Sequence, residues 1–285
     1  MAEAAPSTNP AIDPRTTIGS VGLTVSDVER SRQFYERVIG LAEAGAASLG
    51  APGRPFLELR GDAAAPPLNP RATGLFHFAI LVPDRAELAR SLRRIAEARW
   101  PLDGASDHLV SEALYLSDPD GNGIEIYRDR PREEWPHRDG QVEMATIPLD
   151  LDTLLADSSD VSATVPAGTT VGHVHLKVSE LDNTERFYSG VLGFDVTVRG
   201  YPGALFVSAG GHHHHLGLNT WHSAGASPPP PGSIGLRSFE VVLPDRAAFD
   251  TTLDRVHSAG IQGETVNGGA LIRDPSGNGV LLTVA

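Results

Sequence analysis

Apolar residues alternate with small or polar residues in a segment that occurs twice in the chain. Residues 18–41, IGSVGLTVSDVERSRQFYERVIGL, align without gaps on residues 171–194, VGHVHLKVSELDNTERFYSGVLGF. The alternation predicts a β-strand, and the spacing of apolar residues after the polar turn predicts an amphipathic helix. Each half of the chain is therefore expected to begin with a strand followed by a helix.

A second repeat completes this pattern. Residues 74–98, GLFHFAILVPDRAELARSLRRIAEA, match residues 235–259, and each copy leads to an Asp-Pro-x-Gly-Asn-Gly turn followed by an apolar strand. Such turns connect neighbouring strands. The sequence thus predicts an α+β fold built from four βαβββ modules. Modules one to four are expected at 17–68, 72–130, 170–222 and 234–285, so that two units of two modules cover 17–130 and 170–285.

The remaining segments differ in composition from the modules. Residues 131–169 are acidic and rich in proline, which predicts a linker, with one short helix near residues 149–156. Residues 1–16 are small, polar and proline-rich, which predicts a disordered leader. Neither segment carries a repeat.

Composition narrows the possible partners and metals. The 285 residues carry a formal net charge of -13, and Lys177 is the only lysine, which disfavours nucleic acid and anionic membranes as partners. The sequence has no apolar run of about 18 residues, and it has no cysteine, so a cytoplasmic location is expected. Any metal must be bound through nitrogen and oxygen atoms.

The repeated motifs carry a family resemblance. The paired modules, the segment GHVHL at 172–176 and the FY…VLGF helix ends resemble the vicinal oxygen chelate superfamily, whose members have a glyoxalase fold. Within it, the chain is similar to the two-domain catechol 2,3-dioxygenases from Ile18 onward. The segment HLVSEALYLSDPDGNGIE, from His108 through Tyr115 to Glu125, resembles the extradiol pattern, from which Ser106 is a minor departure.

The resemblance implies metal ligands on the first strands and on one last strand. The first-strand positions of the four modules are Ser20, His77, His173 and Ser238. The last-strand position is Glu125 in module two and Leu281 in module four. Only modules two and three complete a set, which consists of His77, Glu125 and His173. We therefore expect modules to pair as 2+3 and 1+4, with Fe(II), or alternatively Mn(II), bound by these three residues.

Four consecutive histidines, His212–His215, lie between two apolar runs, where a strand is expected. The family motif H-x-x-A/G corresponds to residues 214–217, which implies that His214 is the acid–base residue, with His215 as the alternative. Alternation along a strand would place His213 and His215 on one face and His212 and His214 on the other. An imidazole is suited to this role because it exchanges protons near neutral pH.

Further residues are implied to contact the substrate. Tyr115 and His108 are expected to hydrogen-bond substrate oxygens. His175 is expected to point into the same cup because it lies two residues beyond His173 on its strand. Phe206 and Trp221 are candidates for an apolar wall beside an aromatic ring.

The predicted function is that of an Fe(II)-dependent extradiol dioxygenase. Such an enzyme would cleave a catechol, or a hydroquinone, next to a hydroxyl group with O2. One alternative is a glyoxalase-like metal-dependent isomerase, and another is a non-catalytic small-molecule binding protein of the same fold. A monomer or a homodimer is expected, because four modules in one chain can close the site without a partner.

Overall fold

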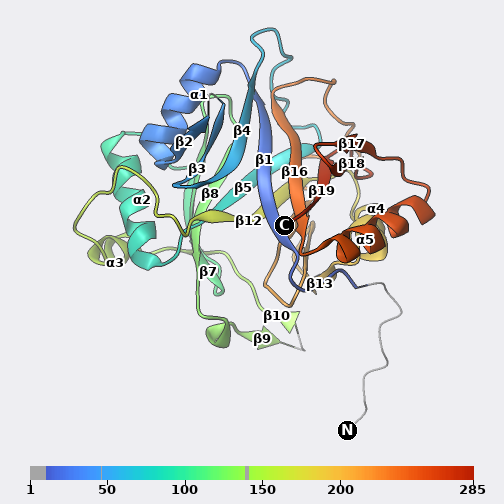
Figure 1. The fold of residues 1–285 in the computed structure, drawn as a ribbon. Coiled ribbons are helices and arrows are strands. Elements are labelled where there is room, and N and C mark those ends of the chain that lie inside the picture. Colours follow the sequence, from blue (N-terminus) through green and yellow to red (C-terminus); the bar gives the residue numbers. More distant parts are fainter. Residues whose placement is uncertain (1–10, 46, 139–140) are drawn as a thin grey trace.

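The chain folds as four similar modules, each with one strand, a helix and three more strands. The structure is a computed structural model that describes residues 11–45, 47–138 and 141–285 (Figure 1). Module one contains β1 (Thr17–Val25), α1 (Val28–Phe34), the π-helical turn η1 (Tyr35–Ile39), β2 (Ala42–Gly45), β3 (Ser48–Ala51) and β4 (Arg54–Gly61). Module two contains β5 (Gly74–Leu81), α2 (Arg85–Glu97), β6 (Gly104–Asp107), β7 (Ser111–Ser117) and β8 (Gly123–Asp129).

The second half repeats this order. Module three contains β12 (Thr170–Lys177), α4 (Leu181–Glu185), the π-helical turn η3 (Arg186–Val191), β13 (Asp195–Val198), β14 (Ala204–Ser208) and β15 (Leu216–Asn219). Module four contains β16 (Gly235–Leu243), α5 (Arg246–Ser258), β17 (Glu264–Val266), β18 (Gly269–Arg273) and β19 (Gly279–Val284). The connector contains η2 (Arg132–Glu134), β9 (His137–Arg138), β10 (Gln141–Val142), β11 (Ile147–Pro148) and α3 (Leu151–Ala156). The short helix expected near residues 149–156 is therefore present.

The modules pair across the two halves of the sequence. An eight-stranded sheet has the order β17-β18-β19-β16-β1-β4-β3-β2, so it combines modules four and one. A nine-stranded sheet has the order β11-β6-β7-β8-β5-β12-β15-β14-β13, so it combines modules two and three. Figure 1 shows β1 and β16 side by side in front of β5 and β12. The predicted 2+3 and 1+4 pairing is confirmed, whereas the unit boundaries at 17–130 and 170–285 stay a prediction.

The nine-stranded sheet has one apolar face and one polar face. On β8, Ile124 and Ile126 join the apolar core, and Glu125 between them points to the opposite side. On β12, Val174 and Leu176 are fully buried in the same core, while the alternate positions hold histidines. The alternation of the sequence therefore separates the core from the candidate site.

Two expected features differ from the structure. Residues 11–16 are not a disordered leader, because Ile12 is buried in the core and its backbone N–H donates to the Gly193 carbonyl at 2.8 Å. Residues 1–10 of the expected leader lie outside the described residues. The prediction of a strand over His212–His215 is wrong, because β15 begins only at Leu216 and the four histidines lie in an irregular turn before it. Two glycines with positive φ, Gly210 and Gly211, open this turn.

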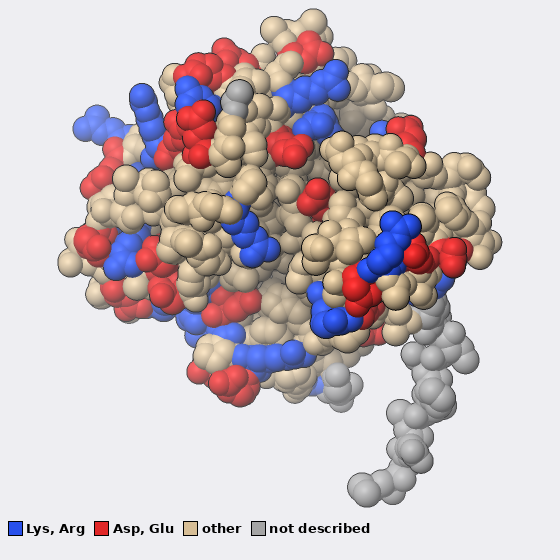
Figure 2. All heavy atoms as spheres, viewed as in Figure 1, with Lys and Arg blue, Asp and Glu red and all other residues tan. Residues whose placement is uncertain are grey.

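The surface carries charges of both signs. Acidic and basic side chains are interspersed on the face that Figure 2 shows. In the described part of the chain, the helices are all too short or too polar to cross a membrane.

Each turn of the Asp-Pro-x-Gly-Asn-Gly type anchors the helix of the preceding module in the sequence. The Tyr35 hydroxyl donates to Asp118 at 3.0 Å, and the Tyr188 hydroxyl donates to Asp274 at 3.1 Å. Both carboxyl groups are buried and also accept backbone N–H groups of their own turns. These turns therefore tie modules together as well as connecting strands.

Removing either hydroxyl is expected to destabilise the protein. In Tyr35→Phe or Tyr188→Phe the buried carboxylate loses one donor, which is expected to lower the free energy of unfolding by about 1–3 kcal/mol. Urea denaturation measures this change. Tyr201→Phe is the control, because its hydroxyl bonds Thr146 at an exposed position. An effect of Tyr35→Phe no larger than that of the control would contradict the prediction.

Candidate metal centre

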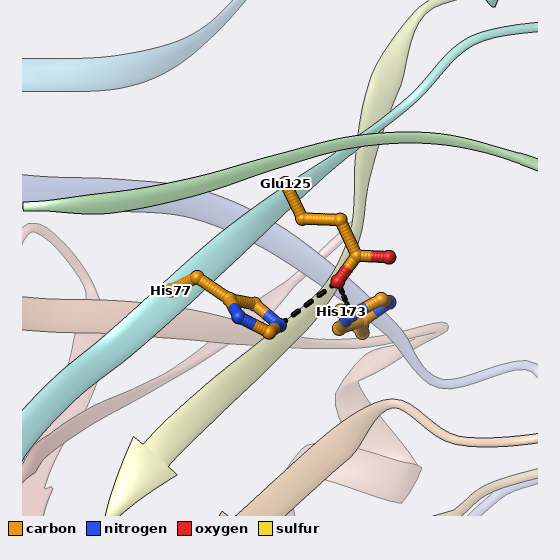
Figure 3. Close-up of side chains that lie close together, drawn as sticks. All are labelled: His77, Glu125 and His173. Carbon is orange, nitrogen blue, oxygen red and sulfur yellow. Dashed lines mark hydrogen bonds and ion pairs between the residues drawn. The ribbon is translucent and has the colours of Figure 1, made fainter. Parts of the chain in front are cut away.

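Three side chains from adjacent strands meet on the polar face of the nine-stranded sheet. His77 lies on β5, Glu125 on β8 and His173 on β12 (Figure 3). The Glu125 Oε2 atom lies 2.9 Å from His77 Nε2 and 3.1 Å from His173 Nε2. All three residues are buried, with exposed fractions of 6% or less. The structure thus brings together the three residues expected to bind the metal.

Strand register explains this convergence. Ala79 on β5 is opposite Glu125 on β8 and also opposite His173 on β12, so these three residues form one row across the sheet. His77 lies two residues from Ala79 on the same face and is opposite His175. Ala79 places only a methyl group in this row, between Glu125 and His173. The sequence pattern did not identify Ala79 as part of the site, because an alanine in an apolar strand carries no sign of function.

The donor set matches what a divalent cation requires. Burial raises the pKa of Glu125, but the neighbouring His173 and His77 outweigh burial and hold that pKa well below its usual range. Burial lowers the pKa of His173, and Glu125 only partly offsets this. The carboxylate and this imidazole are therefore in the deprotonated forms that bind metals.

Two buried nitrogen atoms at this site have no hydrogen-bond partner among the described residues. They are His77 Nε2, whose short contact with Glu125 lacks hydrogen-bond geometry, and His173 Nδ1. Buried polar atoms are normally satisfied, and each exception requires an explanation. A cation beside Glu125 and the two rings would account for the His77 nitrogen and for the buried carboxylate.

The three residues lie at the wall of a cavity of about 330 Å³. The predicted residues that line it are His77, Glu125, His173, His108, Tyr115, His214, His175, Phe206 and Trp221. The other lining residues are Phe76, Ser106, Ser111, Met144, Ala145, Thr146 and Tyr201. Among the described residues that line the cavity, Glu125 is the only Asp, Glu, Lys or Arg.

Tyr115 and His108 are hydrogen-bonded to each other inside the cavity. His108 Nδ1 lies 2.7 Å from the Ala145 carbonyl, so this nitrogen carries the proton because a carbonyl oxygen only accepts. The Tyr115 hydroxyl, 2.6 Å from His108 Nε2, is then the donor in that bond. Burial and the nearby Glu125 raise the pKa of Tyr115 well above its usual value, so the phenol stays neutral.

His175 lines the cavity beside the two expected histidine ligands. Its Nε2 atom is buried and has no partner among the described residues. Burial, together with His77 and His173, holds its pKa well below the usual value, so the ring is neutral. His175 is therefore a neutral imidazole, and its Nε2 atom can offer either a lone pair or an N–H, depending on the tautomer, to a molecule in the cavity.

The histidine run divides into residues with different surroundings. His214 lines the cavity, and its ring centroid lies 4.1 Å from that of His173. His215 does not line the cavity. Its Nδ1 atom instead accepts hydrogen bonds from the Ala209 backbone N–H at 3.1 Å and from the Ser208 hydroxyl at 3.0 Å. Of the two candidates for the acid–base role, the structure places only His214 at the cavity.

Some lining residues could not be found from the local pattern. Phe76 lines the cavity next to His77 because β5 has a bulge there: His175 is opposite His77, whereas Leu176 is opposite Leu75. Tyr201 lies in the loop before β14, and Met144–Thr146 lie in the segment expected only to link the two units. Their positions depend on contacts between distant parts of the chain.

His215 is expected to make stability depend on pH. Burial, with His213 and His173, lowers its pKa to about 4, from 6.5 for the unperturbed side chain. As the pH falls from 6.5 towards 4, the unfolded chain takes up a proton that the folded chain excludes, so the free energy of unfolding falls by up to about 3 kcal/mol.

The variant His215→Asn keeps an oxygen that can accept from the Ala209 N–H but does not titrate. Urea denaturation of the metal-free protein at a series of pH values is expected to show a smaller loss of stability in the variant than in the wild type. The same loss in both proteins would show that His215 is not the group responsible.

Comparisons with known proteins agree with this fold. The chain is 46% identical over 270 residues, 91% of its length and 94% of the relative, to a Bacillus subtilis (strain 168) protein named "Catechol-2,3-dioxygenase". In fold, it is similar to glyoxalase I from Zea mays (TM-score 0.56, 15% identity, 94% of this chain and 92% of that chain). It is also similar to the cppA protein from Streptococcus pneumoniae TIGR4 (TM-score 0.51, 11% identity, 94% and 99%).

A sequence profile of one family matches residues 17–126 and 170–282, which together are most of the chain. The resemblance seen in the repeats and motifs is thereby confirmed. The chain belongs to the Glyoxalase/Bleomycin resistance protein/Dioxygenase superfamily.

Proposed function

We propose that this protein is an Fe(II)-dependent extradiol dioxygenase that opens the ring of a catechol next to a hydroxyl group. The observation that carries the proposal is the meeting of His77, Glu125 and His173 at a cavity that also holds His214 and Tyr115. The 46% identity to a relative named "Catechol-2,3-dioxygenase" supports the same activity. A hydroquinone is the second substrate class, and Mn(II) the second metal.

The donor set favours a non-haem iron site. Two imidazoles and one carboxylate on adjacent strands match the facial arrangement that leaves coordination positions open. The metal would be held by His77, Glu125 and His173, and when bound it would supply a chelation point for the two catechol oxygens and an electron path to O2. Cysteine, the other common ligand for transition metals, is absent from the sequence.

His214 is the residue proposed to move a proton. Burial, together with His173 and His213, holds its pKa well below the usual value, so the free ring is neutral and can accept a proton. Its position beside His173 supports this role, because a substrate bound at the proposed metal site would lie close to it. We assign it the task of accepting a proton from a substrate hydroxyl and returning it before the ring opens.

The other polar residues are proposed to orient the substrate. Tyr115 stays protonated and can redirect its hydroxyl from His108 to a substrate oxygen. The lone pair of His108 Nε2 can then accept a hydrogen bond from a substrate hydroxyl. His175 offers a further polar contact. Phe206, which is buried, and Trp221, which is partly exposed, are proposed to form an apolar wall that contacts the ring.

The first test is oxygen uptake by protein that is loaded with Fe(II) under anaerobic conditions and then mixed with O2 and catechol. One O2 is expected to be consumed for each ring opened, with a yellow semialdehyde product. His77→Ala is expected to lose both bound iron and uptake, because one of three ligands is missing. His137→Ala is the matched control, since His137 is exposed on β9.

Two outcomes would contradict the proposal. Tightly bound metal without oxygen uptake would favour a glyoxalase-like isomerase, which can be examined with thiol adducts of 2-oxoaldehydes. Binding of aromatic compounds without any bound metal would favour a small-molecule binding protein.

The lining of the cavity predicts a preference for uncharged catechols. Within 11–45, 47–138 and 141–285, no Lys or Arg lines the cavity, so a carboxylate on the ring would lack a cationic partner there and would lie near Glu125. An uncompensated buried charge costs several kcal/mol, and each 1.4 kcal/mol corresponds to a factor of ten. We expect kcat/KM for 4-methylcatechol to exceed that for 3,4-dihydroxybenzoate by at least about tenfold. Equal values in steady-state oxygen-electrode measurements would contradict this prediction.

A further inference from the structure

We propose that Asp129 and His213 are positioning residues that fix which ring nitrogen of His214 carries its proton. The inference rests on the proposed function, in which His214 accepts a proton from the substrate. It assigns roles to two residues that do not line the cavity. A chain of hydrogen bonds links them to His214 and so to the site.

The chain of hydrogen bonds begins at the end of β8, the strand that also carries Glu125. The Asp129 Oδ1 atom lies 2.8 Å from His213 Nε2. The His213 Nδ1 atom lies 2.7 Å from His214 Nδ1. The His214 ring in turn packs on His173. The series thus runs from the Asp129 carboxylate through the His213 and His214 rings to His173, one of the three candidate metal ligands.

The protons in this series can be assigned from the chemistry of the groups. A carboxylate oxygen only accepts, so His213 Nε2 carries the N–H. In the proposed series His213 is in its neutral form, in which an imidazole has one N–H, so that His213 Nδ1 has a lone pair and accepts from His214. His214 therefore donates through Nδ1–H, and its Nε2 keeps a lone pair. That lone pair is what a base beside the substrate requires.

The packing around His213 restricts the orientation of its ring. His213 is fully buried, and its ring contacts the side chain of Trp135 and lies near that of Tyr127, with centroid distances of 5.1 and 6.3 Å. Rotation of the buried ring would break both hydrogen bonds at once. Burial and the two hydrogen bonds therefore favour the observed orientation of His213.

The same cluster could be interpreted as a second metal site, because ligand atoms of Asp129, His212 and His213 lie near one another. Two observations favour the hydrogen-bonded series instead. Both ring nitrogens of His213 already have partners, unlike His77 Nε2 in the candidate metal centre. His212 Nε2 is 3.8 Å from Asp129, too far for a hydrogen bond.

The direct test is the tautomer of His214 in the metal-free protein, read from ¹⁵N chemical shifts after labelling with ¹⁵N-histidine. The signal is assigned by its loss in His214→Gln. We expect Nδ1–H with unprotonated Nε2 in the wild type. Asp129→Asn is expected to shift the proton towards Nε2, because the amide N–H can donate to His213 and reverse the series.

Kinetics of the iron-loaded protein provide the second readout. Asp129→Asn and His213→Leu are expected to lower kcat by about 10- to 100-fold, with little change in KM and in iron content. His213→Asn should recover much of the loss, because its side-chain oxygen can still accept from His214. His212→Asn is the matched control within the run and should keep the wild-type kcat.

Three results would overturn the proposal. The first is a ¹⁵N signature of His214 that is the same in the wild type, Asp129→Asn and His213→Leu. The second is an unchanged kcat in both variants. The third is a second equivalent of bound iron that is lost in His212→Asn, which would identify the cluster as a metal site. An absence of oxygenase activity in the wild type would instead count against the proposed function, because the tautomer is measured without metal.

Discussion

The antiparallel pairing of β5 with β12 is the contact on which the candidate site depends. It joins a strand from each half of the sequence and sets His77 opposite His175 and Ala79 opposite His173. A slip of one residue would turn Phe78 and Val174 towards the cavity and the histidines into the apolar core. The same register therefore determines the stability of the fold and the convergence of the polar side chains.

The eight-stranded sheet pairs β1 with β16 in the same way but lacks the candidate ligands. In the sheet of modules one and four, the position equivalent to Ala79 is Glu240, which is opposite Leu281 on β19. The Glu240 carboxylate accepts the backbone N–H of Ser20 at 2.9 Å. A long side chain thus extends towards the first strand, at the row where the other sheet has only the methyl group of Ala79. The pseudo-symmetric sheet keeps the architecture, and its own side chains occupy the equivalent position.

The sequence was sufficient for features that depend on local pattern and repetition. Alternation placed Glu125 and His173 on the polar face, and the gain or loss of ligand types among the four modules predicted how the modules pair. It was insufficient where the chain departs from regular geometry. The bulge that brings Phe76 beside His77 and the turn that replaces a strand at His212–His215 arise from tertiary contacts. Alternation therefore could not predict which histidine faces the cavity.

The cost of burying polar groups on this face of the nine-stranded sheet explains why Asp129, His213 and His214 are hydrogen-bonded in series. Burying Glu125 and several imidazoles between strands costs free energy unless each group has a partner. The apolar face of the same strands, which includes Ile124, Ile126 and Val174, provides the burial that offsets this cost. Asp129 satisfies His213, and His213 satisfies His214, so these partners lie away from the cavity. Among the groups without partners in the described part of the chain, His77 Nε2 and His175 Nε2 belong to residues that line the cavity, where a metal and a substrate could complete them.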